Sequence, residues 1–129
     1  MELGIATTLT TSFDEAVARA RAALQEQGFG VLTEIDMQAT LKAKLGEDIG
    51  RYLILGACNP MLAHRAVSLN RQIGLLLPCN VVVRADGDAV VVEAMNPQLM
   101  VEVADDAELA VVADEATTRL RTAIDSLAD

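Results

Sequence analysis

The sequence of 129 residues predicts a single α+β domain, a two-layer sandwich in which helices pack on one face of a mixed, mainly antiparallel sheet. Three observations support this fold class. Hydrophobic residues make up 52% of the chain and charged residues 22%, as in globular domains. Apolar residues alternate with polar ones in some segments and recur at helical spacing in others. An Asp86-Gly87 turn signal lies between two valine runs, which indicates a β-hairpin.

Predicted strands alternate with predicted helices in the first half of the chain. We assign three segments as strands: residues 3–9, 29–35 and 51–56. The first helix begins at a capping box formed by Ser12 and Glu15 and ends before Gly28. A second, short helix is predicted over residues 37–45. Because residues 51–56 are apolar on both faces, this strand is expected to be central.

The third helix is predicted from its first residues. Asn59 stands at the N-cap position and Pro60 at the first helical position. The apolar stripe of this helix is expected to comprise Leu62, Ala66, Leu69 and Ile73. The last helix has a second predicted capping box, Asp105 with Glu108, and a long apolar stripe: Leu109, Val112, Ala116, Leu120, Ile124 and Leu127. Residues 98–103 between these helices receive no assignment.

The hairpin predicts a sheet with two unlike faces. A two-residue turn at Asp86-Gly87 places Val83 opposite Val90 and Asn80 opposite Glu93. One face is then wholly apolar and is expected to lie under helices: Cys79, Val81, Val83, Val90, Val92 and Ala94. The other face is mixed, and it is expected to be either wet or covered by a partner: Asn80, Val82, Arg84, Ala89, Val91 and Glu93.

The formal net charge of −9 comes from the last third of the chain. Residues 1–85 carry eight acidic and eight basic residues, whereas residues 86–129 carry eleven acidic residues and only Arg119 and Arg121 as bases. Nucleic-acid phosphates require a basic face, and three aromatic residues cannot form a base-stacking platform. We therefore expect no nucleic-acid partner.

The cysteines and the N-terminus indicate the compartment. Cys58 and Cys79 are the only cysteines, and no secretion signal precedes them, so we expect reduced thiols and a cytoplasmic protein. No apolar run approaches the ~20 residues that a membrane helix needs. A membrane partner is therefore not expected.

Three short motifs carry a resemblance to a known family. They are Gly56-Ala57-Cys58-Asn59-Pro60, Leu77-Pro78-Cys79-Asn80 and Met95-Asn96-Pro97. From Phe13 to the C-terminal helix, the chain resembles the domain-of-unknown-function family numbered 302. The resemblance implies a small two-layer α+β fold that occurs in bacteria and archaea. It implies no established activity, so it transfers no catalytic residues.

Cys58 lies where a central strand is predicted to meet a helix. Backbone N–H groups and the helix dipole favour an anion at such a junction and could activate a thiol as a nucleophile. In the alternative interpretation, Asn59 caps the helix, Pro60 begins it and Cys58 packs as a small hydrophobic residue. His64 lies on the polar side of the same helix, as a candidate acid or base or as a surface residue without a role.

Asn80 interrupts an apolar strand, where asparagine is disfavoured. It is either a ligand contact flanked by Arg84 or a solvated residue beside Glu93 on an open face. Cys58, His64 and Cys79 would suit Zn²⁺ chemically, but they are expected to diverge, so no metal site is predicted. The candidate ligand-binding residues are Cys58, Asn59, His64, Cys79, Asn80 and Arg84.

The sequence contains no complete catalytic set and does not identify a cofactor. It favours a non-catalytic homodimer that binds a small ligand, with Val82 and Val91 on the mixed hairpin face as the partner surface. One alternative is a thiol-dependent enzyme in which Cys58 is the nucleophile and His64 or Asn80 assists. Another is a protein-interaction module whose acidic C-terminal helix binds a basic partner.

Overall fold

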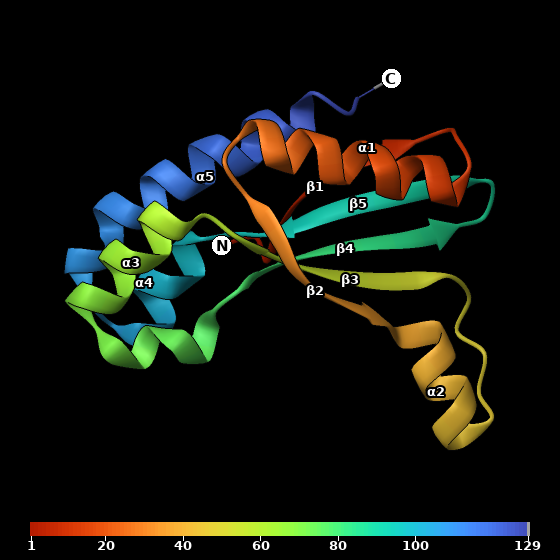
Figure 1. Ribbon diagram of the computed structural model, residues 1–129, viewed down its shortest axis with the longest axis horizontal. Helices are drawn as coiled ribbons and strands as arrows, with labels where there is room; N and C mark the ends of the chain where they lie inside the picture. Colours follow the sequence, from red (N-terminus) through yellow and green to blue (C-terminus); the bar gives the residue numbers. More distant parts are fainter. Residues whose placement is uncertain (129) are drawn as a thin grey trace.

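The computed structural model describes residues 1–128 (Figure 1). Its strands are β1 (Gly4–Leu9), β2 (Gly30–Asp36), β3 (Tyr52–Cys58), β4 (Cys79–Asp86) and β5 (Ala89–Met95). Its α-helices are α1 (Phe13–Glu26), α2 (Met37–Leu45), α3 (Pro60–Leu69), α4 (Gln98–Ala104) and α5 (Ala110–Asp125). Two short 3₁₀ helices complete the chain, η1 (Arg71–Leu76) and η2 (Ala107–Leu109).

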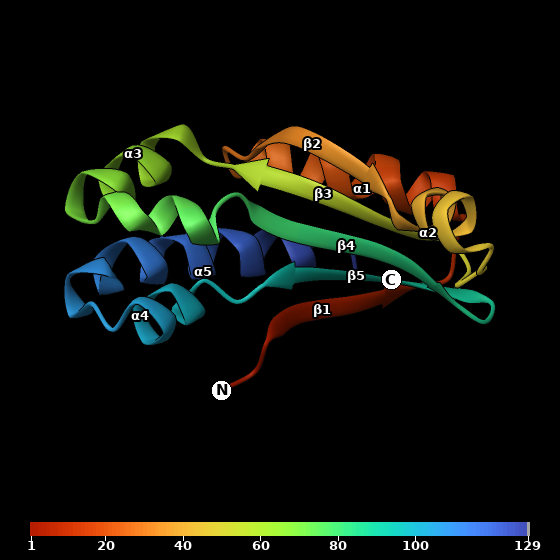
Figure 2. The ribbon, with the colours of Figure 1, turned by 90° about the horizontal axis from the view of Figure 1, so that it is seen from below.

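The strands form one five-stranded sheet in the order β1-β5-β4-β3-β2. The predicted two-layer α+β fold is confirmed, but each pair of neighbouring strands is antiparallel, whereas the sequence predicted a mixed, mainly antiparallel sheet. The reason is that α2 and α3 do not form crossovers between parallel strands. Helix α2 is inserted between the antiparallel neighbours β2 and β3, and α3 with η1 is inserted between β3 and β4. These two insertions leave the sheet at opposite ends (Figure 2).

Helices α1 and α5 cover one face of the sheet and enclose the main core. Leu24 and Leu120 from the two helices pack with Leu55, Val83 and Val92 from the strands, and all five side chains are buried. A second core lies beyond the end of the sheet, where α3, η1, α4 and α5 meet around Leu62, Ile73, Met100, Leu109 and Val112. Strand β3 has β2 and β4 as its neighbours, as expected for an interior strand.

The other face of the sheet carries no helix layer (Figure 2). We call it the open face. Strand register and alternation assign its residues: Gly4, Ala6, Thr8, Thr33, Ile35, Tyr52, Ile54, Gly56, Asn80, Val82, Arg84, Asp86, Ala89, Val91, Glu93 and Met95. The predicted mixed face of the hairpin thus belongs to a larger surface that spans all five strands.

The hairpin turn lies one residue later than its sequence signal indicated. Asp86 pairs with Ala89, so Gly87 and Asp88 form the two-residue loop. Gly87 takes φ of 60° at the first loop position, where a type II′ turn requires glycine. The register therefore differs from the predicted one by two residues: Val83 faces Val92. Because strand faces alternate with a period of two, each side chain stays on its predicted face.

Three further boundaries differ from the prediction. A bulge between Val31 and Thr33 puts Thr33 and Ile35 on the open face, away from the face of Val31. Helix α3 ends at Leu69, which is 44% exposed, and Ile73 is buried from η1 instead. The second capping box was predicted at Asp105 for the last helix. In the structure Asp106 is the capping residue instead, and it caps η2, where its side chain accepts a hydrogen bond from the Glu108 N–H.

Candidate ligand-binding site

The junction of β3 and α3 is built as the helix-capping interpretation predicts. The Asn59 side chain accepts a hydrogen bond from the Leu62 N–H at 3.2 Å, and Pro60 begins the helix. Proline has no N–H and the Leu62 N–H is already paired, so the first turn of α3 has few donors left for an anion. The N-terminus of α3 is therefore arranged to begin the helix, and it offers little to a bound anion.

Cys58, Asn59 and Cys79 line the same cavity beneath α3, together with Phe29 and Met100. The cavity has a volume of about 20 Å³. A single water molecule needs roughly 10–15 Å³ by the same measure, so this cavity holds one or two waters and no larger ligand. The first Cys-Asn motif and the second cysteine thus meet in the structure, in a space that is too small for a substrate.

The two thiols differ in environment. Cys79 is buried opposite Ala57, and burial, followed by the neighbouring Cys58, raises its pKa from 9.0 to about 11. Cys79 is therefore protonated at neutral pH and is a poor nucleophile. Cys58 is half-buried and is the more accessible thiol.

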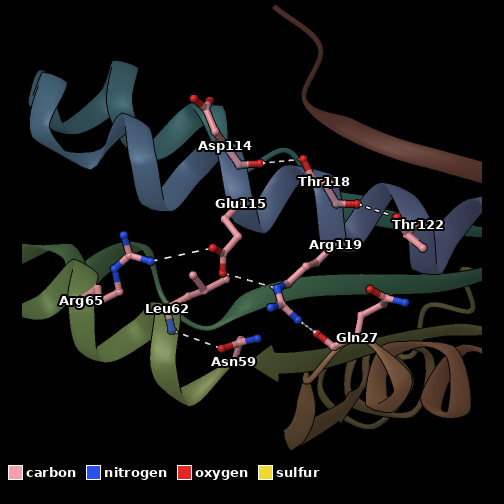
Figure 3. Close-up of polar contacts among 9 residues, drawn as sticks. All are labelled: Gln27, Asn59, Leu62, Arg65, Asp114, Glu115, Thr118, Arg119 and Thr122. Carbon is pink, nitrogen blue, oxygen red and sulfur yellow. Dashed lines mark hydrogen bonds and ion pairs between the residues drawn. The ribbon is translucent and has the colours of Figure 1, made fainter.

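A polar network ties the α3 junction to the neighbouring helices (Figure 3). Arg119 on α5 donates to the Gln27 carbonyl at 3.2 Å, just after α1. Glu115, one turn earlier on α5, pairs with Arg119 at 3.4 Å and with Arg65 of α3 at 3.9 Å. The Asn59 amide lies close to Gly28: a Cβ added at Gly28 would be 2.9 Å from the Asn59 Nδ2. This network holds α1, α3 and α5 together, and the sequence did not predict it.

Asn80 and Arg84 lie on the open face, away from the α3 cavity. They line a hollow of about 290 Å³, which we call the face hollow, with Tyr52, Val82 and Glu93. Arg84 donates to the Glu93 carboxylate at 3.0 Å, and both side chains are about one-third exposed. Within residues 1–128, the Asn80 side chain has no hydrogen-bond partner, so its amide is available to a ligand. The two Cys-Asn motifs therefore contribute to different cavities.

His64 belongs to neither cavity. It is exposed on α3 and lines neither the α3 cavity nor the face hollow. Among the residues that the structure describes, no group of three or more His, Cys, Asp or Glu side chains could hold a metal ion. Tyr52 of the face hollow was not identified from the sequence. Strand alternation could have identified it, because Tyr52 is two residues from Ile54 and four from Gly56 and so lies on the same face of β3, the face without helices.

None of the helices in residues 1–128 has the length and apolar character needed to cross a membrane. Fold and site together define a two-layer α+β domain whose antiparallel sheet has one face without helices, and the face hollow lies on that face beside Asn80. The family model described as Domain of unknown function DUF302 matches residues 5–127, so the chain belongs to that family.

Among the solved structures that match, one is similar along nearly the whole chain. It is the crystal structure of an uncharacterized conserved protein DUF302 from Bacillus stearothermophilus, with a TM-score of 0.91 and 27% sequence identity. The match covers 98% of this chain and 99% of that one. No curated protein matches the chain.

Proposed function

We propose that the chain is a non-catalytic homodimer that associates through the open face and binds a small ligand in the face hollow. The observation that carries this proposal is a five-stranded sheet with apolar side chains on a face that no helix covers. Ile35, Ile54, Val82 and Met95 lie on that face, and Ile35 is 45% exposed; Val91 lies there too but is already buried by its neighbours in the chain. Antiparallel sheets that face water on one side usually carry polar residues there, so an apolar open face favours a protein partner.

The charges of the open face favour a second copy of the chain as that partner. The whole chain carries a formal net charge of −9, yet the open face carries three charged residues: Arg84 and Glu93, which pair with each other, and Asp86 at the hairpin end of β4. Because the single unmatched carboxylate lies at the edge of the face, two such faces can approach with little repulsion. In a two-fold interface the same surface faces itself, so each Arg84 could also reach the Glu93 of the other copy.

The face hollow supports the ligand-binding part of the proposal. Its volume of about 290 Å³ is close to the lower limit of roughly 300 Å³ for small-molecule sites. Val82 and Met95 give it apolar walls, while the Asn80 amide and the Arg84 guanidinium supply donors. A second copy over the open face would close the hollow on its exposed side. The free thiols of Cys58 and Cys79 suit a reducing compartment, and we place the homodimer in the cytoplasm.

Native mass spectrometry of gently purified protein, repeated under denaturing conditions, tests both parts of the proposal. We expect a dimer with an added mass that is lost on denaturation. Asn80→Ala should keep the dimer and lose the added mass, while Gln25→Ala, at an exposed residue of α1 outside the face hollow, should keep both. Monomers at every concentration would contradict the whole proposal, and a dimer without added mass would contradict ligand binding.

A further inference from the structure

Residues 37–50, which we call the α2 arm, extend from the sheet without cover. Helix α2 contains no buried residue, and every residue from 42 to 50 is exposed. Leu45 and Ile49 are apolar but 69% and 49% exposed. The arm projects beyond the sheet, away from α1 and α5, and so towards the side of the open face (Figures 1 and 2).

The α2 arm nevertheless has a defined local geometry. The Asp36 side chain caps α2 by accepting from the Ala39 N–H at 2.9 Å, and Gly46 ends the helix in the left-handed region. The Asp48 carboxylate accepts from the Gln38 side chain at 3.1 Å and from the Gly50 N–H at 2.9 Å, which ties the loop back to the helix. A helix of nine residues is too short to be stable alone in water, so the arm needs contacts beyond itself.

A matching surface lies at the other end of the molecule. Between η1 and α4 is a hollow of about 230 Å³, the docking hollow, lined by Ile73, Leu75, Leu76 and Val103 among others. Leu75 and Val103 are 84% and 66% exposed. An apolar side chain such as Leu45 would fill part of this hollow and remove all three residues from water.

The charges around the two surfaces are complementary. Lys42 and Lys44 lie in the last turn of α2, beside Leu45. In the sequence, the lining residues of the docking hollow are flanked by three acidic residues, Glu102, Asp105 and Asp106, and by one base, Arg71. The Asn70 side chain, which lines the hollow, donates to the Asp106 carboxylate at 3.3 Å. The loop of the arm carries Glu47, which could pair with Arg71, while Asp48 is held within the arm. Opposite charges at the rim of an interface help to set its orientation.

The area of the open face also indicates a need for further contacts. Five strands about 4.8 Å apart and about seven residues long, at about 3.4 Å per residue, make a face of roughly 600 Å². A stable interface buries about 800 Å² on each partner. The α2 arm and the docking hollow would supply the missing area.

We propose that the α2 arm of each subunit docks into the docking hollow of a second copy. This inference rests on the proposed homodimer. If two open faces pack about a two-fold axis perpendicular to the strands, the α2 end of one subunit lies against the α3–α4 end of the other (Figure 2). Both arms then make the same contact, and the assembly closes as a dimer and does not extend as a filament.

Cross-linking tests this arrangement. The protein carries Leu45→Cys and Leu75→Cys in a Cys58→Ser background and is treated with a short bismaleimide. Positions 45 and 75 lie at opposite ends of a sheet about 24 Å long, so a short link between them joins two chains. We expect a covalent dimer from this variant and none when Val111→Cys, on α5, replaces Leu75→Cys.

The outcomes distinguish the proposed arm contact from the proposed homodimer through the open face. A dimer in sedimentation that gives no link between positions 45 and 75 overturns the arm contact and leaves the proposed homodimer standing. A monomer at every concentration overturns both. A ladder of larger covalent species overturns the closed arrangement. Leu45→Asp should also weaken the dimer by roughly tenfold, while Val111→Asp, at a residue 63% exposed on α5, should not; equal effects would contradict the contact.

Discussion

Two adjacent valines of β4 test the unlike faces of the sheet. Val83 is fully buried under the helices, opposite Leu53 and Val92, whereas Val82 lies on the open face. Val→Thr keeps the shape and the β-branched character, so it leaves no cavity and changes strand preference little. At Val83 the new hydroxyl meets only apolar side chains, and burying it without a partner should lower the free energy of unfolding by about 1–3 kcal/mol.

Urea unfolding followed by far-UV circular dichroism measures this difference. A loss of about 2 kcal/mol lowers the midpoint by about 1 M at a typical urea slope. Val83→Thr should show this loss at every protein concentration. Val82→Thr should be destabilised only at concentrations where the dimer forms, because its hydroxyl stays hydrated in the monomer. Equal losses for both variants at high dilution would refute the assignment of the two faces.

Three further predictions concern the α3 junction. Because burial raises the Cys79 pKa, the folded protein retains a proton that the unfolded chain releases, so the free energy of unfolding should fall as pH rises from 9.0 to about 11. In urea titrations at several pH values, Cys79→Ala should remove this decrease. Alkylation of the folded protein should modify Cys58 alone. Asn59→Ala should lower the free energy of unfolding by about 0.5–2 kcal/mol, and Asn59→Asp, which can still cap, should lose less; equal losses would contradict the capping role. Gly28→Ala should lower the thermal midpoint, because Gly28 has φ of 83° and its Cβ would meet the Asn59 amide; an unchanged midpoint would contradict this close contact.

Features set by local chemistry were predicted well from the sequence. Ser12 and Asn59 cap their helices as predicted, since capping depends on residues within one turn. The apolar stripe predicted for the last helix is buried from Leu109, in η2, through α5 to Leu127, because helical periodicity fixes which side faces the core. The hairpin faces were also correct although the register was not, because the error was an even number of residues.

Features set by distant contacts were not predicted. The bulge after Val31 reverses the faces of Thr33 and Ile35, and nothing in the local sequence marks it. The separation of Asn80 from Cys58 depends on strand pairing with β3, which puts Asn80 opposite Gly56 on the open face. The network of Arg65, Glu115 and Arg119 joins helices about fifty residues apart in sequence, and periodicity carries no information on such contacts.

Sedimentation velocity over a wide concentration range tests the central claim most directly, with wild-type protein beside Val82→Asp and Val111→Asp. Both substitutions add one negative charge at a valine, but only Val82 lies on the open face. The account predicts a concentration-dependent dimer for the wild type and for Val111→Asp, and a monomer for Val82→Asp. A wild-type monomer at every concentration, or a dimer that Val82→Asp leaves intact, would contradict association through the open face.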